Sequence, residues 1–170
     1  MAAQLGVCYF GGRSMFFGNE TNNEPSGKRI EDIFRKADID ARYTTDINYV
    51  AWKKYLFVSP LANATTFLNT TIGGILEDRE GVELMDNILD ELLALARVYS
   101  IDFPEDIKKS TIEKYRGFPY KAKTSLQIDF EQGKRTEIET FVEFIINKAK
   151  RLGLPIATHE KIYTALRTRS

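Results

Sequence analysis

Apolar residues recur every three or four positions through most of this chain, which is the spacing of helices that pack one face on a core. In the clearest case, over about 79–99, that face carries Val82, Met85, Ile88, Leu92, Leu95 and Ala96. Further helices are predicted after the capping residues Ser26 and Asp46, near 102–104, over about 136–151, and after the capping residue Thr158. The predicted fold class is therefore mainly α.

Prolines and glycines predict where these helices end. Pro60 lies inside the helix that starts near Ile47, and we expect it to kink or break that helix because proline lacks a backbone N–H. The pair Gly73 and Gly74 is expected to end the same segment. The sequence GLP at 153–155 is expected to stop the helix before it.

The start of the chain has a different pattern. The segments LGVCYFG and SMFFGN predict two short strands within residues 5–19, and a polar loop follows at 20–27. Two strands alone are marginal in water. We therefore interpret residues 1–24 as residual strands of a truncated N-terminal domain, and residues 25–170 as an all-α domain. Within the latter, residues 41–50 are predicted to be an extended connector.

The composition of the chain limits which classes of partner it can bind and which cell compartment it fits. The chain has 170 residues, 43% of them hydrophobic, with 24 basic and 24 acidic residues. Zero net charge gives no indication of nucleic-acid binding, and no apolar run reaches the roughly 18–20 residues that span a membrane. A single cysteine, Cys8, fits a reducing cytoplasm and is expected to be buried. A single histidine, His159, cannot build a multi-histidine metal site and is expected at the surface.

Lys54 is a candidate for chemistry because it lies in an otherwise apolar helix. It shares a helical face with residues four and eight positions later, which are Val58 and Ala62. If that face lines a cleft, the ammonium group can donate a proton or a hydrogen bond to a carbonyl oxygen that gains negative charge. The alternative is a lysine whose stem covers apolar surface while its charge stays in water.

A second candidate cluster lies in the sequence KTSLQIDFEQGKRTEIE at 123–139. Ser125 and Asp129 share a face, Gly133 permits a turn, and Glu137 falls in the first turn of the next helix, where a carboxylate is stabilised. In the functional interpretation, Ser125 and Glu137 bind a polar ligand beside Lys54. In the alternative, Glu137 only stabilises its helix. The polar run at 63–71 has the same two interpretations, ligand contact or satisfaction of a helix end.

These segments, taken in order, resemble the C-terminal domain of ketopantoate reductases (2-dehydropantoate 2-reductases). The matching elements over residues 47–167 are WKK, NATTFLNTTIGG, TSLQIDFEQGKRTEIE and AKRLGLPIATHEKIYTAL. The resemblance implies an N-terminal Rossmann domain followed by an all-α domain of the 6-phosphogluconate dehydrogenase C-terminal type, with the active site in the cleft between them. Residues 5–19 resemble the last strands of that nucleotide-binding domain.

The resemblance also implies a reaction, the NADPH-dependent reduction of ketopantoate to pantoate on the route to pantothenate and coenzyme A. Lys54 then resembles the catalytic lysine that polarises and protonates the ketone oxygen. Glu137 resembles the catalytic glutamate, and Ser125 the serine that contacts the substrate carboxylate or hydroxyl. The implied partners are a small 2-oxo acid and, as a homodimer, a second copy of the chain.

The chain departs from the family pattern in two ways. Val58 and Ala62 occupy positions where the family usually has substrate-orienting asparagines, and Ser59 and Asn63, one residue later, are the replacement candidates. A different 2-oxo acid therefore remains an alternative substrate, and a related two-domain reductase an alternative enzyme. The sequence also contains no G-x-G-x-x-G, so we expect the chain alone to bind NADPH weakly and not to turn over. A non-catalytic helical domain that dimerises or binds a small acid is the other alternative.

Overall fold

The structure, a computed structural model, describes residues 5–9, 14–19, 24–134, 136, 138 and 142–168. The chain forms two compact units, Met1–Tyr55 and Leu56–Ser170. The predicted domain boundary after residue 24 stays a prediction.

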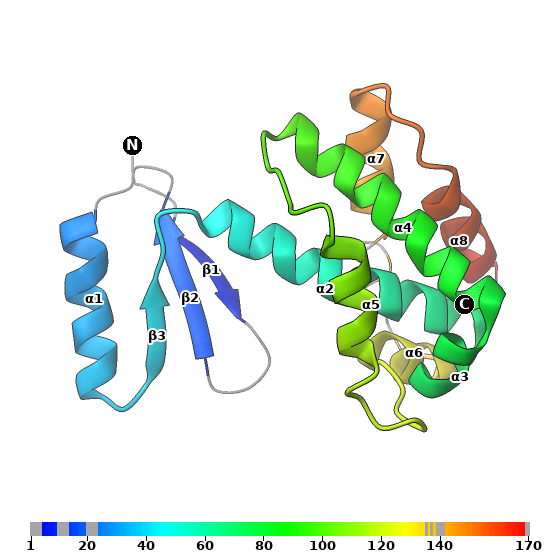
Figure 1. Ribbon diagram of the computed structural model, residues 1–170, viewed down its shortest axis with the longest axis horizontal. Helices are drawn as coiled ribbons and strands as arrows, with labels where there is room; N and C mark the ends of the chain where they lie inside the picture. The colour runs from blue at the N-terminus through cyan, green and yellow to red at the C-terminus, as the bar shows by residue number, and fades with distance from the viewer. Residues whose placement is uncertain are drawn as a thin grey trace. The chain divides into compact units, whose positions relative to one another are not determined.

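Among the described residues, two strands, a helix and a third strand come first, and all later elements are helices (Figure 1). The first unit contains β1 (Leu5–Tyr9), β2 (Ser14–Asn19), α1 (Glu24–Lys36), β3 (Asp40–Tyr43) and the start of α2 (Ile47–Leu68). The second unit contains the rest of α2 and then α3 (Ile72–Glu77), α4 (Arg79–Val98), α5 (Ile107–Tyr115), α6 (Ser125–Glu131), α7 (Phe144–Arg151) and α8 (Ala157–Arg167). The prediction of a mainly α chain is confirmed.

The first unit is a three-stranded sheet with one helix packed on it. The two strands predicted within residues 5–19 are present as β1 and β2; they pair antiparallel, while β3 pairs in parallel with β2. The prediction of a connector at 41–50 is wrong at both ends. Residues 47–50 begin α2, whose start near Ile47 was predicted, and residues 41–43 belong to β3. They are held as a strand by pairing with β2, and Ala41 turns into the core. α1 approaches β3 closely at Gly27, where any Cβ atom would overlap the ring of Tyr43.

The core of the second unit is built around α4. This helix packs against α3 and α8, and α7 packs against α8 (Figure 1). The buried apolar residues of α4 are Met85, Ile88, Leu89, Leu92, Leu93, Leu95 and Ala96. The helix ends within one residue of its predicted limits, because its apolar spacing is regular over five turns.

Pro60 does not end α2, which continues to Leu68. Proline removes one backbone donor and disturbs the turn before it. In the same turn, the Tyr115 hydroxyl donates a hydrogen bond of 2.7 Å to the carbonyl oxygen of Phe57. Burial raises the pKa of the Tyr115 phenol, which stays protonated and can donate at any physiological pH.

The predicted end of this helical segment at Gly73 and Gly74 is wrong. Asn69 takes a left-handed conformation (φ 51°) directly after α2, and the two glycines lie inside α3. Asp46 caps α2 as predicted, because its carboxylate accepts a hydrogen bond of 3.0 Å from the N–H of Tyr49. Gly153 has a φ of 67° two residues after α7, in agreement with the predicted stop.

His159 is fully buried, so the prediction of a surface histidine is wrong. Its Nδ1 lies 2.6 Å from Oε2 of Glu91 on α4. The same carboxylate accepts hydrogen bonds from the backbone N–H groups of Thr158 (2.6 Å) and His159 (3.1 Å). Thr158, predicted to cap α8, instead lies inside the helix, and Glu91 satisfies the first N–H groups from a distant part of the chain.

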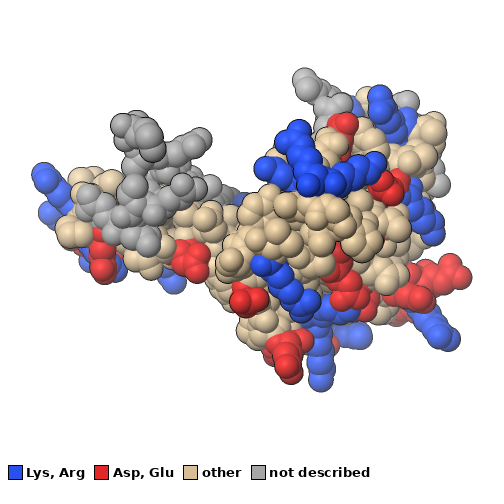
Figure 2. All heavy atoms as spheres, turned by 90° about the horizontal axis from the view of Figure 1, so that it is seen from above, with Lys and Arg blue, Asp and Glu red and all other residues tan. Residues whose placement is uncertain are grey.

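The surface of the second unit carries charges of both signs. On the face drawn in Figure 2, basic and acidic side chains both border a broad area without charged side chains. This mixture agrees with equal numbers of basic and acidic residues in the sequence. Within the described part of the chain, no helix combines the length and apolar character needed to cross a membrane.

Candidate functional site

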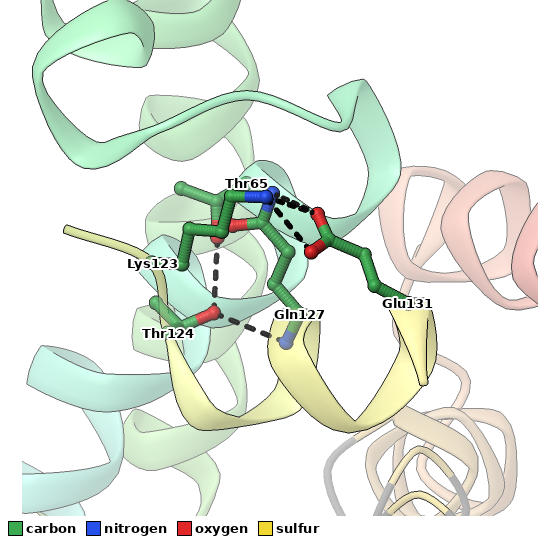
Figure 3. Close-up of polar contacts among 5 residues, drawn as sticks. All are labelled: Thr65, Lys123, Thr124, Gln127 and Glu131. Carbon is green, nitrogen blue, oxygen red and sulfur yellow. Dashed lines mark hydrogen bonds and ion pairs between the residues drawn. The ribbon is translucent and has the colours of Figure 1, made fainter. Parts of the chain in front are cut away.

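Two threonines join α2 to the start of α6. The Thr65 hydroxyl donates to the carbonyl oxygen of Leu61 at 2.8 Å, and it lies 3.2 Å from the hydroxyl oxygen of Thr124 (Figure 3). Because Thr65 has only one proton to donate, Thr124 is the donor between the two hydroxyls. Thr124 in turn accepts from the N–H of Gln127 at 3.4 Å and so caps α6. The result is a directed chain of hydrogen bonds from α6 into α2.

Ser125 is the first residue of α6 and follows Thr124 directly. Thr124 has extended backbone angles (φ −75°, ψ 156°), so the chain changes direction there and the side chain of Ser125 is exposed. Ser125 and Asp129, which were expected to share a face, lie four residues apart in this helix. Gly133 has a φ of 62°, as the predicted glycine turn requires. Ser125 is therefore presented to solvent by a turn that is anchored on α2.

A buried amide and an ion pair join the start of α6 to its last residue, Glu131. The Gln127 side chain is 1% exposed, and its Nε2 donates to Oε1 of Glu131 at 3.1 Å. Lys123 binds both carboxylate oxygens of Glu131 at 2.8 Å (Figure 3). The Gln127 Oε1 is buried and has no partner in the part of the chain that the structure describes. The sequence did not single out Gln127.

Ser59 and Asn63 are brought together on α2, and both are fully buried. The Asn63 Nδ2 donates to Oγ of Ser59 at 3.0 Å. The Asn63 Oδ1 is buried and has no hydrogen-bond partner among the described residues. The substrate-binding role of this pair stays a prediction.

The predicted site residues are divided between the two units. Lys54 lies half-buried on the part of α2 that belongs to the first unit, while Ser59, Asn63 and Ser125 belong to the second. Glu137 lies outside the described residues, and so do the side chains of β1, including Cys8. Among the described residues, no three His, Cys, Asp or Glu side chains gather as a metal site.

Thr65 lies at the junction between α2 and the start of α6, and the sequence analysis did not single it out from the polar residues around it. A usable signal was its position eleven residues after Lys54, which is about three turns of the same helix. Residues at that separation lie on nearly the same face. The contact with Thr124 could not be read in the same way, because it joins residues 59 positions apart.

A comparison with protein families identifies the chain. Residues 46–170 match the model described as the ketopantoate reductase PanE/ApbA C-terminal family. The chain belongs to this family. The expected resemblance is thereby confirmed, and so is the assignment of the helical part to the C-terminal domain of these enzymes.

Relatives of this PanE/ApbA C-terminal chain are oxidoreductases. An uncharacterised oxidoreductase, YkpB of Bacillus subtilis, is 27% identical over 153 residues, which cover 89% of the chain and 50% of that protein. The chain spans about half the length of the curated relatives it matches.

Solved structures agree on the fold. A dimeric ketopantoate reductase from Staphylococcus aureus superimposes with a TM-score of 0.81 at 19% identity, covering 99% of this chain and 60% of the other. A D-mandelate dehydrogenase in a ternary structure with NADH and anilino(oxo)acetate also gives 0.81, at 16% identity, covering 94% of this chain and 67% of the other.

Proposed function

We propose that this chain is the substrate-binding and catalytic part of an NADPH-dependent 2-oxo-acid reductase, with ketopantoate as the leading substrate. The observation that carries the proposal is the Thr65–Thr124 junction. It fixes the start of α6, and with it the exposed Ser125, in a chain of the ketopantoate reductase C-terminal family.

Three residues have proposed roles. Lys54 donates a proton to the ketone oxygen as that oxygen gains negative charge during reduction. Ser125 binds the carboxylate or the hydroxyl of the substrate through its exposed side chain. Glu137, which lies outside the described residues, is proposed as the second catalytic residue.

Ser59 and Asn63 are proposed to orient the substrate in place of the asparagines of the family. The Asn63 Oδ1 is buried and has no partner among the residues that the structure describes, which supports this role, because such an acceptor is costly until a donor reaches it. A hydroxyl group on the substrate would supply that donor.

The chain's own residues do not fit the main site for a dinucleotide. That site needs a glycine-rich turn of the G-x-G-x-x-G type, where the backbone approaches the pyrophosphate, and the sequence contains none. The proposal therefore gives this chain only substrate binding and proton donation. Reduction needs the domain that binds NADPH.

The test uses the natural full-length protein and follows NADPH oxidation with ketopantoate. Lys54→Ala is expected to lower kcat by about 10²-fold or more, the usual scale for a general acid. Lys53→Ala is the control, because Lys53 is the exposed neighbour of Lys54 and is expected to be dispensable. A near-normal kcat in Lys54→Ala would contradict the role of Lys54.

A different 2-oxo acid is the second candidate substrate. Val58 and Ala62 are apolar where the family usually has asparagines, and a D-mandelate dehydrogenase shares the fold. The same assay with the 2-oxo acid that corresponds to mandelate separates the two. A higher kcat/KM for the aromatic acid would favour this candidate over ketopantoate.

A homodimer is proposed as the assembly, because one solved structure with this fold is a dimeric ketopantoate reductase. Sedimentation of the full-length protein measures it directly. A dimer without turnover of any 2-oxo acid would favour the non-catalytic alternative.

A further inference from the structure

The loop between α5 and α6, residues 117–123 with the sequence GFPYKAK, is bound to the start of α3. The N–H of Ile72 donates to the carbonyl of Ala122 at 2.9 Å, and the N–H of Gly73 donates to the carbonyl of Tyr120 at 2.8 Å. The first N–H groups of a helix have no partner within it. The loop therefore supplies acceptors that α3 needs.

The side chain of Tyr120 also binds this loop to α3. Gly73 lies against the Tyr120 ring so closely that a Cβ atom at position 73 would overlap the ring. The Tyr120 hydroxyl donates to Oε2 of Glu77 at 2.7 Å. Because Gly73 and Glu77 are one turn apart, the ring lies along α3 and is held at both ends.

Two further contacts anchor the loop on α2. The ring of Phe118 lies 6.2 Å from that of Phe57, measured between centroids. At the other end, the Thr124 hydroxyl meets Thr65 at 3.2 Å. Tyr120 lies between these anchors, so it restrains the backbone that leads into Ser125.

We propose that Tyr120 is a positioning residue for the substrate contact of Ser125. This inference rests on the proposed function, which gives Ser125 that contact. Tyr120 does not touch the substrate; its ring and hydroxyl hold the loop on α3, and the loop sets where α6 begins. A misplacement of about 1 Å at a binding group can cost a large factor in rate or affinity.

The experiment compares variants of the full-length protein in two measurements. Tyr120→Ala removes the ring, and Gly73→Ala expels it by steric overlap. Tyr120 is 54% exposed, so its ring can move into solvent and both variants are expected to fold. We expect faster amide hydrogen exchange over residues 120–128, and a KM for the 2-oxo acid raised about tenfold with kcat nearly unchanged, as for a lost binding contact.

Glu77→Gln and Glu77→Ala form a matched pair. Glutamine keeps an acceptor for the Tyr120 hydroxyl, so Glu77→Gln is expected to retain most of the wild-type KM. Glu77→Ala is expected to raise KM, though less than Tyr120→Ala does, because the ring stays in place.

Unchanged hydrogen exchange at residues 124–127 in Tyr120→Ala and Gly73→Ala would overturn the inference, and so would faster exchange with an unchanged KM. A wild-type protein that reduces no 2-oxo acid would contradict the proposed function instead. In that case the exchange measurement alone decides whether Tyr120 positions Ser125.

Discussion

The hydroxyl groups of Thr65 and Thr124 hold the backbone next to Ser125 in place. The chain from the Gln127 N–H through Thr124 and Thr65 to the Leu61 carbonyl uses each hydroxyl once as donor and once as acceptor. Such a chain has one direction only, and a methyl group at either position interrupts it. The start of α6 therefore depends on two oxygen atoms.

Thr124→Val tests this dependence, because valine keeps the shape of threonine and removes the oxygen. We expect a loss of about 1–2 kcal/mol in the free energy of unfolding, since a helix cap and a part-buried hydrogen bond both disappear. Urea denaturation measures the loss. Thr124→Ser keeps the hydroxyl and should recover most of the stability, and equal losses in the two variants would contradict the assignment.

Tyr115→Phe removes the hydroxyl that donates to Phe57 near Pro60. The variant removes this donor from the Phe57 carbonyl, in the turn before Pro60, which itself has no backbone N–H. We expect destabilisation of about 1–2 kcal/mol, the scale of a lost buried hydrogen bond. Thermal denaturation measures it, with Tyr120→Phe as a comparison whose partner is an exposed carboxylate. A smaller effect in Tyr115→Phe than in Tyr120→Phe would contradict this account.

At the level of helices and strands, regular patterns were predictable and long-range contacts were not. The limits of α4 followed from its apolar spacing. β3 was missed because its four residues form a strand only by pairing with β2. The capping of α8 was missed because its acceptor, Glu91, lies 67 positions before Thr158. Local sequence carries no signal for such partners.

The same reasoning applies to the candidate site. Ser125 was singled out from its local sequence, and the turn at Gly133 was predicted correctly, whereas the short helix α6 was not predicted. Its anchors on α2 and α3 depend on contacts across 43 to 59 positions, between Tyr120 and Glu77 and between Thr124 and Thr65. Only the folded chain reveals them.

The Glu91 carboxylate predicts how the packing of α8 responds to acid. Burial alone would raise the pKa of Glu91, but hydrogen bonds from the His159 ring and from the N–H groups of Thr158 and His159 lower it below its ordinary value of 4.5. The native state then binds fewer protons than the unfolded state. The contribution of Glu91 to stability is complete above about pH 4.5 and is lost as the pH falls through the lowered pKa.

Glu91→Gln measures this contribution. We expect a lower free energy of unfolding at pH 7, because the amide has one acceptor oxygen in place of two, and a flatter decline in stability below pH 4.5. Urea denaturation at several pH values between 3 and 7 follows both. Glu83→Gln, an exposed carboxylate on the same helix, is the control. An unchanged pH dependence in Glu91→Gln would contradict the assignment.

For the whole molecule, we propose that the chain supplies the residues that bind the substrate and not those that bind the dinucleotide. The family match covers residues 46–170, and the chain spans about half of its curated relatives. The main determinants of NADPH binding belong to a glycine-rich turn that the sequence lacks. We therefore expect NADPH binding to need the full-length protein, whereas the residues proposed to bind the substrate are present in this chain.

The two proteins can be compared directly by titrating each with NADPH and following nicotinamide fluorescence. We expect the full-length protein to bind NADPH and to oxidise it with a 2-oxo acid, and the 170-residue chain to do neither. Far-ultraviolet circular dichroism shows that the shorter chain is folded, so that absence of binding reflects missing residues and not an unfolded protein. Saturable NADPH binding by the folded 170-residue chain would contradict the expectation, since it would require a nucleotide site other than the glycine-rich turn.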